Sequence, residues 1–220
     1  WVSAMQCGGE IGPFGANRHG DADTQCMSYL ANGVAPSIEA IEKAGGTPRE
    51  FCTITVTDGI AMGHQGMKSS LVSREVIADS IELTMRGHCY DALVGIAGCD
   101  KSLPGTMMAM LRLNVPSVFM YGGSILPGRF RGKDVTVLDV FEGVGMHSAG
   151  KMSSEDLHEL ECVACPSAGA CGGQFTANTM AMVLTAPGLS PVGLNDIPAT
   201  DPGKRAAAFR CGEIAMARLA

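Results

Sequence analysis

A thiol, a carboxylate and an amine stand side by side at Cys99, Asp100 and Lys101. They follow DALVGI, an apolar run typical of a buried strand, within the stretch AGCDKSLPG at 97–105. Thiolates select zinc, copper(I) or iron–sulfur centres, whereas carboxylates suit Mg²⁺. One strand end therefore offers ligands for two different inorganic centres, and each centre needs further ligands from elsewhere in the chain.

A second carboxylate, Asp58, follows another β-rich run and opens the Gly-rich segment at 57–67. If the two strands are neighbours in a parallel sheet, Asp58 and Asp100 approach one another at its carboxyl edge and suit Mg²⁺. Helix capping is the alternative role for either Asp taken alone. Lys101 has three possible roles: an ion-pair partner, a base, or a lysine whose neutral amine adds CO₂ to become an anionic carbamate ligand.

Nine cysteines supply a pool of thiols. The N-terminus shows no basic segment followed by an apolar one, so we expect a reducing compartment in which cysteines are core residues, metal ligands or nucleophiles. Cys171 stands before a glycine pair at a predicted helix start, where the helix dipole favours a thiolate. Cys162, Cys165 and Cys171 form a C-x₂-C-x₅-C pattern that could bind zinc but lacks a clear fourth ligand. We expect four cysteines to be buried: Cys52, Cys89, Cys162 and Cys211.

Strands and helices that alternate along the chain must position these residues. Apolar, β-rich runs predict strands at 50–56, 91–98 and 115–121. Helical periodicity predicts helices at 27–44, 70–87, 104–114, 136–147, 153–163, 174–184 and 201–219. Segments 57–67, 122–134 and 165–173 are predicted to be loops. The repeated strand–loop–helix order predicts an α/β fold: a parallel βαβ sheet with helices on both faces.

Composition narrows the class of function. A net charge of −6, an aromatic content of 5% and the lack of a Lys/Arg cluster argue against nucleic-acid binding. No run of 18 apolar residues is present, so we expect no membrane span and a cytoplasmic protein, or an organellar one in a eukaryote. The chain has no initiator Met and stops within a predicted helix, so we expect a piece of a longer polypeptide.

Four longer motifs resemble the dihydroxy-acid/6-phosphogluconate dehydratase family. They are TDGIAMGHQGMKSSLVSREVIADSIE (57–82), CDKSLPGTMMAMLRLNVPS (99–117), YGGSILPGRFRGKDVT (121–136) and CPSAGACGGQFTANTM (165–180). The resemblance covers about residues 26–220. It implies an iron–sulfur- and Mg²⁺-dependent hydro-lyase that converts 2,3-dihydroxy carboxylic acids to 2-keto acids in valine, leucine and isoleucine biosynthesis. It also implies a homodimer.

The resemblance gives separate roles to the residues already singled out. Cys99 and Cys171 match ligands of an iron–sulfur cluster, whose type ([2Fe–2S] or [4Fe–4S]) stays open. Asp58 and Asp100 match Mg²⁺ ligands, and Lys101 matches a carbamylated lysine that binds the same ion. The substrate would be a small dihydroxy acid held between the two centres.

The first cluster ligand has two candidates. Cys26 stands 32 residues before Asp58, the interval that the family pattern leads us to expect, while Trp1 and Cys7 also have a matching interval. We favour Cys26 and keep Cys7 as the alternative. The family's catalytic serine base and a further glutamate ligand lie in a C-terminal domain. We therefore expect residues 1–220 to form an N-terminal iron–sulfur- and Mg²⁺-binding α/β domain without its own catalytic base.

Two other functions stay under consideration. The same family contains aldonate dehydratases, which act on longer sugar acids, although the LPG turn and the GGSILPGRF loop resemble the branched-chain enzymes more. A non-catalytic metal or redox module that uses the C-x₂-C pair belongs to another class. Protein that carries zinc without iron or acid-labile sulfide would favour this module.

Overall fold

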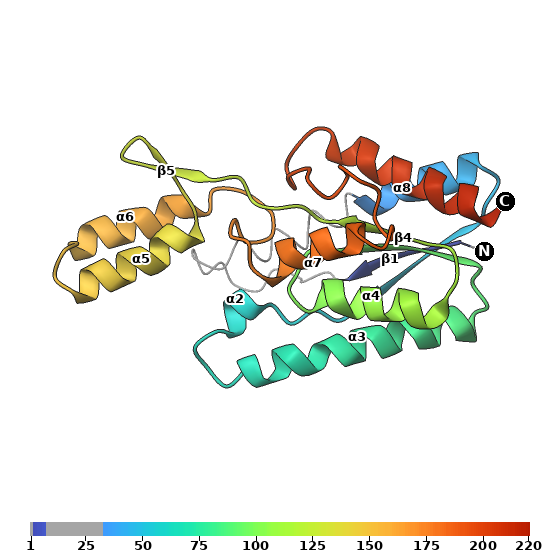
Figure 1. Ribbon diagram of the computed structural model, residues 1–220, viewed down its shortest axis with the longest axis horizontal. Coiled ribbons are helices and arrows are strands. Elements are labelled where there is room, and N and C mark those ends of the chain that lie inside the picture. The colour runs from blue at the N-terminus through green and yellow to red at the C-terminus, as the bar shows by residue number, and fades with distance from the viewer. Residues whose placement is uncertain (1, 8–32) are drawn as a thin grey trace.

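A parallel sheet of four strands forms the centre of the molecule (Figure 1). The structure is a computed structural model that describes residues 2–7 and 33–220. The strand order is β2-β1-β3-β4, and every adjacent pair is parallel. The strands are β1 (Val2–Cys7), β2 (Pro48–Thr53), β3 (Ala92–Ala97) and β4 (Ser117–Tyr121). Their carboxyl ends all meet at one edge of the sheet.

Apart from Ser117, the strands β3 and β4 consist of apolar or aromatic residues because both faces of the sheet are covered there. Every residue of these two strands is buried. Their side chains alternate between two cores: Leu93 and Phe119 belong to one, and Val94 and Val118 to the other. The strand β2 lies at the sheet edge and is only partly buried.

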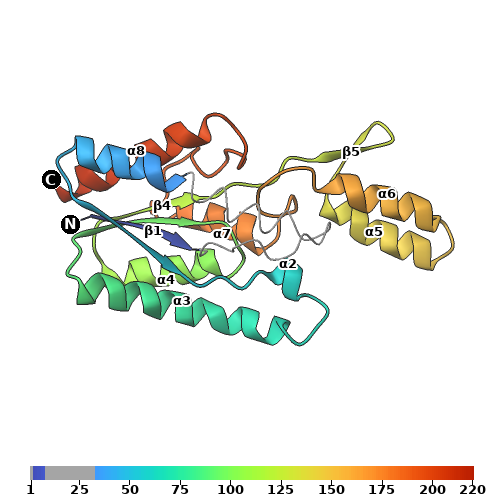
Figure 2. The same ribbon diagram turned by 180° about the vertical axis from the view of Figure 1, so that it is seen from behind.

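Helices pack on both faces of the sheet, which confirms the predicted architecture (Figures 1 and 2). Helices α3 (Met67–Gly87), α4 (Ser102–Leu113) and α7 (Thr176–Thr185) contribute to one core. Helix α8 (Lys204–Leu219) and helical residues 33–43 contribute to the other. A short helix, α2 (Asp58–Ala61), lies in the segment predicted as a Gly-rich loop. Within the described residues, no helix has both the length and the apolar character to span a membrane.

A helical hairpin extends away from the sheet (Figure 2). It consists of α5 (Val137–Ser148) and α6 (Ser154–Ala164), which share a small core around Val135 and Leu160. An antiparallel pair of short strands, β5 (Gly128–Phe130) and β6 (Lys133–Val135), precedes it. The prediction of a loop at 122–134 is wrong over these strands, because three-residue strands are too short to show an alternating pattern.

Candidate metal centre

Asp58 begins α2, just beyond the carboxyl end of β2. The Lys101 ammonium donates to Asp58 Oδ2 at 2.7 Å, and the Ser70 hydroxyl of α3 donates to Oδ1. The two side chains of the ion pair are only 10% and 14% exposed, so solvent screens it little. Burial opposes ionisation of Asp58, but the hydrogen bonds from Lys101 and Ser70 outweigh it and hold the pKa of the carboxyl below its usual value.

Asp100 supplies the second carboxyl group and shares a hydrogen bond with Asp58. Burial, together with the adjacent Asp58 carboxylate, raises the pKa of Asp100 to about 6. Two carboxylates in contact repel one another when both are ionised, and a divalent cation bound by both removes that cost. The pair therefore fits Mg²⁺, which binds proteins through carboxylate oxygens.

The predicted approach of Asp58 and Asp100 required their strands to be neighbours, and that condition is wrong. The strand β1 lies between β2 and β3. The side chains still meet because α3 and α4, which follow them, pack against each other. At this contact a Cβ on Gly105 of α4 would lie 2.8 Å from the carbonyl oxygen of Arg74 in α3. Close helix packing therefore draws the two loops together above the strand ends.

Lys101 takes the ion-pair role, one of the three that the sequence left open. A further hydrogen bond of 3.1 Å joins the hydroxyls of Thr55 and Ser102, so the segments after β2 and β3 are linked beside the ion pair. Carbamylation of Lys101 stays a prediction.

The two predicted cluster ligands, Cys99 and Cys171, are half-buried and lie on separate loops. The Cys171 loop is fixed to the chain that leaves β4. The Ala170 N–H donates to the Gly123 carbonyl at 2.9 Å, and the Ile125 N–H donates to the Ala170 carbonyl at 2.8 Å. Gly169 has a φ of +140°, and a Cβ there would lie 2.3 Å from the Ile125 nitrogen, so this position requires glycine.

The first turn of α7 links these two loops. The N-cap residue Phe175 has no side-chain acceptor for the exposed N–H groups of the helix. Asp100 takes this role from the β3–α4 loop, because its carboxylate accepts a hydrogen bond from the Ala177 N–H. The helix dipole favours a negative charge at this end. The segment that carries Cys99 and Asp100 is thus joined to the helix that follows Cys171.

Cys26 and Cys7 are the two candidates for the first cluster ligand. Cys26 lies outside the described residues. Cys7 ends β1 and pairs with Thr53 of β2, and the residue before it, Gln6, pairs with Ile96 of β3. The backbone of Cys7 therefore lies at the carboxyl edge, between the strands that lead to Asp58 and Cys99. In the part of the chain that the structure describes, no three His, Cys, Asp or Glu side chains form a metal-binding group. The expected ligand sets also include Lys101 and a thiol from the first 26 residues.

The predicted burial of the other cysteines is confirmed only for Cys211, which lies in the core beneath α8. Cys52 is exposed because β2 is an edge strand, and Cys89 is exposed in the turn after α3. Cys162 is exposed because α6 buries only Leu160 and Ala164. Its Sγ lies 3.8 Å from Nε2 of His158, on the hairpin that extends away from the sheet.

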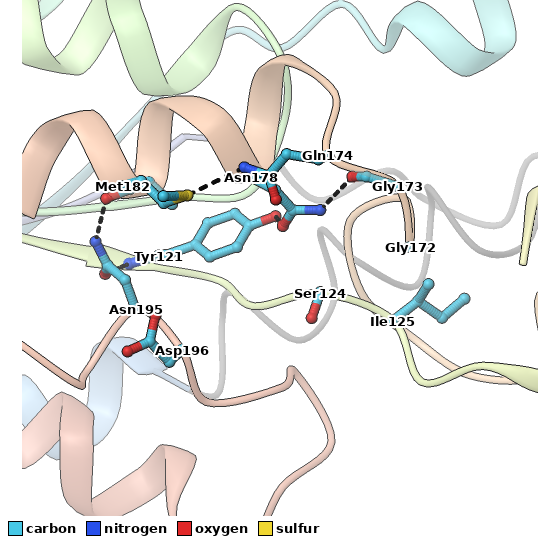
Figure 3. Close-up of a pocket in the computed structure, with 11 residues that line it drawn as sticks. Tyr121, Ser124, Ile125, Gly172, Gly173, Gln174, Asn178, Met182, Asn195 and Asp196 are labelled. Carbon is cyan, nitrogen blue, oxygen red and sulfur yellow. Dashed lines mark hydrogen bonds between the residues drawn. The ribbon is translucent and has the colours of Figure 1, made fainter. Parts of the chain in front are cut away.

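A polar cavity of about 320 Å³ lies beside the Cys171 loop (Figure 3). Tyr121, Asn178 and Asn195 line it, together with Gly172 and Gly173. The sequence alone gives no signal for a role of these side chains or of Ser70. The FTANTM motif contains Asn178, but neither composition nor spacing reveals that its side chain contacts β4 and the preceding loop.

A family profile and individual proteins of known name both show similarity to this chain. The family profile described as "Dihydroxy-acid/6-phosphogluconate dehydratase N-terminal" matches residues 21–220. The "Dihydroxy-acid dehydratase" of Parvibaculum lavamentivorans is 72% identical over 182 residues, which are 83% of this chain and 32% of that protein. The protein of the same name from Pelagibacter ubique is 80% identical over 152 residues, 69% of this chain and 27% of its own length. The chain thus spans about a third of these relatives.

Proposed function

Because the chain belongs to the dihydroxy-acid/6-phosphogluconate dehydratase family, we propose that it forms the metal-binding part of a dihydroxy-acid dehydratase. This hydro-lyase would convert 2,3-dihydroxy carboxylic acids to 2-keto acids in valine, leucine and isoleucine biosynthesis. The main support from the structure is the convergence of Asp58, Asp100 and Lys101 at the carboxyl edge of the sheet. The names of the relatives favour this substrate class over longer sugar acids. The activity is proposed for a protein of the relatives' length.

Asp58 and Asp100 would bind Mg²⁺ through their carboxylate oxygens. Cys99 and Cys171 would bind an iron–sulfur cluster, with Cys26 or Cys7 as the third ligand. When bound, the ion and the cluster would supply the positive charge that orients a dihydroxy acid and weakens the bond to its departing hydroxyl. The chain's own part is to hold these ligands on rigid elements: Ser70 fixes the Asp58 carboxylate, and the Ala177 N–H fixes that of Asp100.

Carbamylation of Lys101 is part of the proposal. The neutral amine would add CO₂ and release a proton, which gives an N-carboxylate with two further oxygen ligands. In the structure, the Lys101 ammonium neutralises Asp58. When the Asp58 carboxylate serves a metal instead, the amine can lose its proton and react.

The remaining elements of the proposal concern the whole protein. Residues 1–220 would form one N-terminal domain, and the catalytic base would come from the part of the relatives that this chain does not cover. We propose a homodimer, which light scattering after size-exclusion chromatography tests, and a cytoplasmic or, in a eukaryote, organellar location.

A chimeric enzyme tests the proposed function. The stretch of the Parvibaculum lavamentivorans protein that aligns with this chain would be replaced by this chain and purified without oxygen. We expect keto-acid formation from 2,3-dihydroxyisovalerate that exceeds turnover of gluconate, and none after Cys99→Ala. Preference for gluconate would assign the sugar-acid activity. Zinc in place of iron and sulfide, with no turnover of either acid, would favour the non-catalytic module.

A further inference from the structure

Asn178 lies in the first turn of α7 and contacts the loop that carries Cys171. Its side-chain Nδ2 donates to the carbonyl oxygen of Cys171 at 2.8 Å and to that of Gly173 at 2.6 Å. One amide group therefore uses both of its N–H bonds on the loop. These bonds fix the peptide unit that follows Cys171 and the one that follows Gly173, directly after the thiol-bearing residue.

The other end of the Asn178 side chain is attached to the sheet. Its Oδ1 accepts a hydrogen bond of 2.7 Å from the hydroxyl of Tyr121, the last residue of β4 (Figure 3). Tyr121 is only 2% exposed and belongs to the core on the α7 face of the sheet. The position of the Asn178 amide is thus set by a side chain that has little freedom to move.

This arrangement reverses the usual polarity of a helix start. A side chain near the start of a helix usually accepts hydrogen bonds from backbone N–H groups. Asn178 donates to backbone carbonyls instead, while Asp100 from another loop accepts from the Ala177 N–H. A carboxylate at position 178 would accept from Tyr121 equally well, but its second oxygen would face the two backbone carbonyls with no hydrogen to donate. The contacts at this position therefore select an amide over a carboxylate.

We propose that Asn178 is a positioning residue that holds Cys171 in place to bind the iron–sulfur cluster, with Tyr121 as its anchor. This inference rests on the proposed function, because it takes Cys171 to be a cluster ligand. Groups that orient a metal ligand change metal affinity about 10- to 100-fold when they are replaced. Loss of the Asn178 donors should therefore weaken the cluster without unfolding the protein.

Asn195 offers a matched control. Like Asn178 it lines the cavity, accepts one hydrogen bond from Tyr121 and donates to a backbone carbonyl, here that of Ala181 at 2.8 Å. Among the described residues, its side-chain hydrogen bonds go to Tyr121, Ala181 and Thr185, and not to residues 171–173. Asn178→Asp and Asn195→Asp therefore remove the same kind of donor from the same region, but only the first removes it from the Cys171 loop.

The experiment compares the wild-type protein with Asn178→Asp, Asn195→Asp and Tyr121→Phe after anaerobic purification. One readout is the rate at which a chelator removes iron, followed by the visible absorption of the cluster. The second is the rate at which iodoacetamide alkylates Cys171 in metal-free protein, measured by peptide mass spectrometry. Thermal unfolding reports the general loss of stability, which should be similar for the two Asn variants.

We expect Asn178→Asp to lose iron about 10-fold faster than the wild type and to expose Cys171 to faster alkylation, with a smaller effect in Tyr121→Phe. Asn195→Asp should match the wild type in both readouts. Equal rates for Asn178→Asp and wild type, or equal acceleration in both Asn variants, would overturn the proposal. Wild-type protein without iron would contradict the proposed function, and the alkylation rates would still test whether Asn178 holds the loop.

Discussion

Replacement of Asp100 by asparagine should stabilise the metal-free protein at neutral pH and remove its response to Mg²⁺. Asparagine imitates the protonated carboxyl: its amide can donate to Asp58, and its oxygen can accept from the Ala177 N–H, as Asp100 does. The substitution removes the negative charge that burial and Asp58 disfavour. It also removes one of the two carboxylates that we expect to bind the ion.

The size of the effect follows from the pKa of Asp100, which is raised from 3.8 to about 6. Each pKa unit is worth about 1.4 kcal/mol, which gives about 3 kcal/mol for this shift. Because Asp100 is only partly buried, solvent screening lowers the expected effect to about 1.5–3 kcal/mol. The folded state favours the neutral form of Asp100. The contribution of this carboxyl to wild-type stability is therefore complete below pH 3.8 and is lost as the pH rises through about 6.

The assay is urea unfolding of metal-free protein at pH 5 and pH 7.5. The lowered pKa of Asp58 acts in the opposite direction, since its stabilisation is present above its unfolded value and is lost only in acid. Asp58 therefore contributes little change between these two pH values. More than half of this effect is already present at pH 5, because that pH lies above the unfolded pKa of 3.8. The stability advantage of Asp100→Asn over wild type should therefore grow by about 0.7–1.4 kcal/mol from pH 5 to pH 7.5.

Addition of Mg²⁺ should then stabilise the wild type, by about 2.7 kcal/mol at an ion concentration 100 times the Kd, and leave Asp100→Asn nearly unchanged. Asp134→Asn is the control, because Asp134 lies on the hairpin strand β6 in an exposed ion pair with Arg129. It should alter neither the pH dependence nor the response to Mg²⁺. An Asp100→Asn protein whose stability relative to wild type is the same at both pH values would refute the reasoning.

Three further predictions concern single residues. Cys99→Ala should abolish iron and sulfide binding, whereas Cys162→Ala, on the exposed face of α6, should retain both. Metal analysis after anaerobic purification measures this, and iron retained by Cys99→Ala would contradict the assignment. Lys101→Arg should keep a cation beside Asp58 but cannot form a carbamate, so Mg²⁺ retention should fall. A carbamate signal in the NMR spectrum after ¹³C-bicarbonate labelling should also disappear, and unchanged Mg²⁺ retention would count against the carbamate. Gly169→Ala should lower the free energy of unfolding by about 1–3 kcal/mol, because φ is +140° and the new Cβ would lie 2.3 Å from a backbone nitrogen. Urea unfolding measures this, and an unchanged free energy of unfolding would contradict it.

The sequence predicts the centre of the fold well where the physical signal is local. Predicted strands at 91–98 and 115–121 enclose β3 and β4, because strands buried on both faces are apolar without interruption. Helices α3 to α8 lie where helical periodicity placed them, since each packs one face against a core. The strands β5 and β6 were not predicted because each has only three residues and is partly exposed.

The sequence likewise predicts some features of the candidate site and misses others. The sequence places Asp58 and Lys101 near strand ends, and the structure joins them in one ion pair. Burial of Cys52 and Cys162 was predicted wrongly, because burial depends on whether a strand lies at the sheet edge and on which helix face has a partner. The role of Asn178 depends on hydrogen bonds to residues up to 57 positions away, which no local pattern encodes.

The most direct test of the metal assignment is a crystal structure of anaerobically purified protein with diffraction data collected on both sides of the iron absorption edge. We predict iron bonded to Cys99 and Cys171, with the third sulfur ligand identifying Cys26 or Cys7. A separate lighter ion should lie between the carboxylates of Asp58 and Asp100. Absence of iron at Cys99 and Cys171, or a metal bound instead at Cys162 and Cys165, would contradict the assignment.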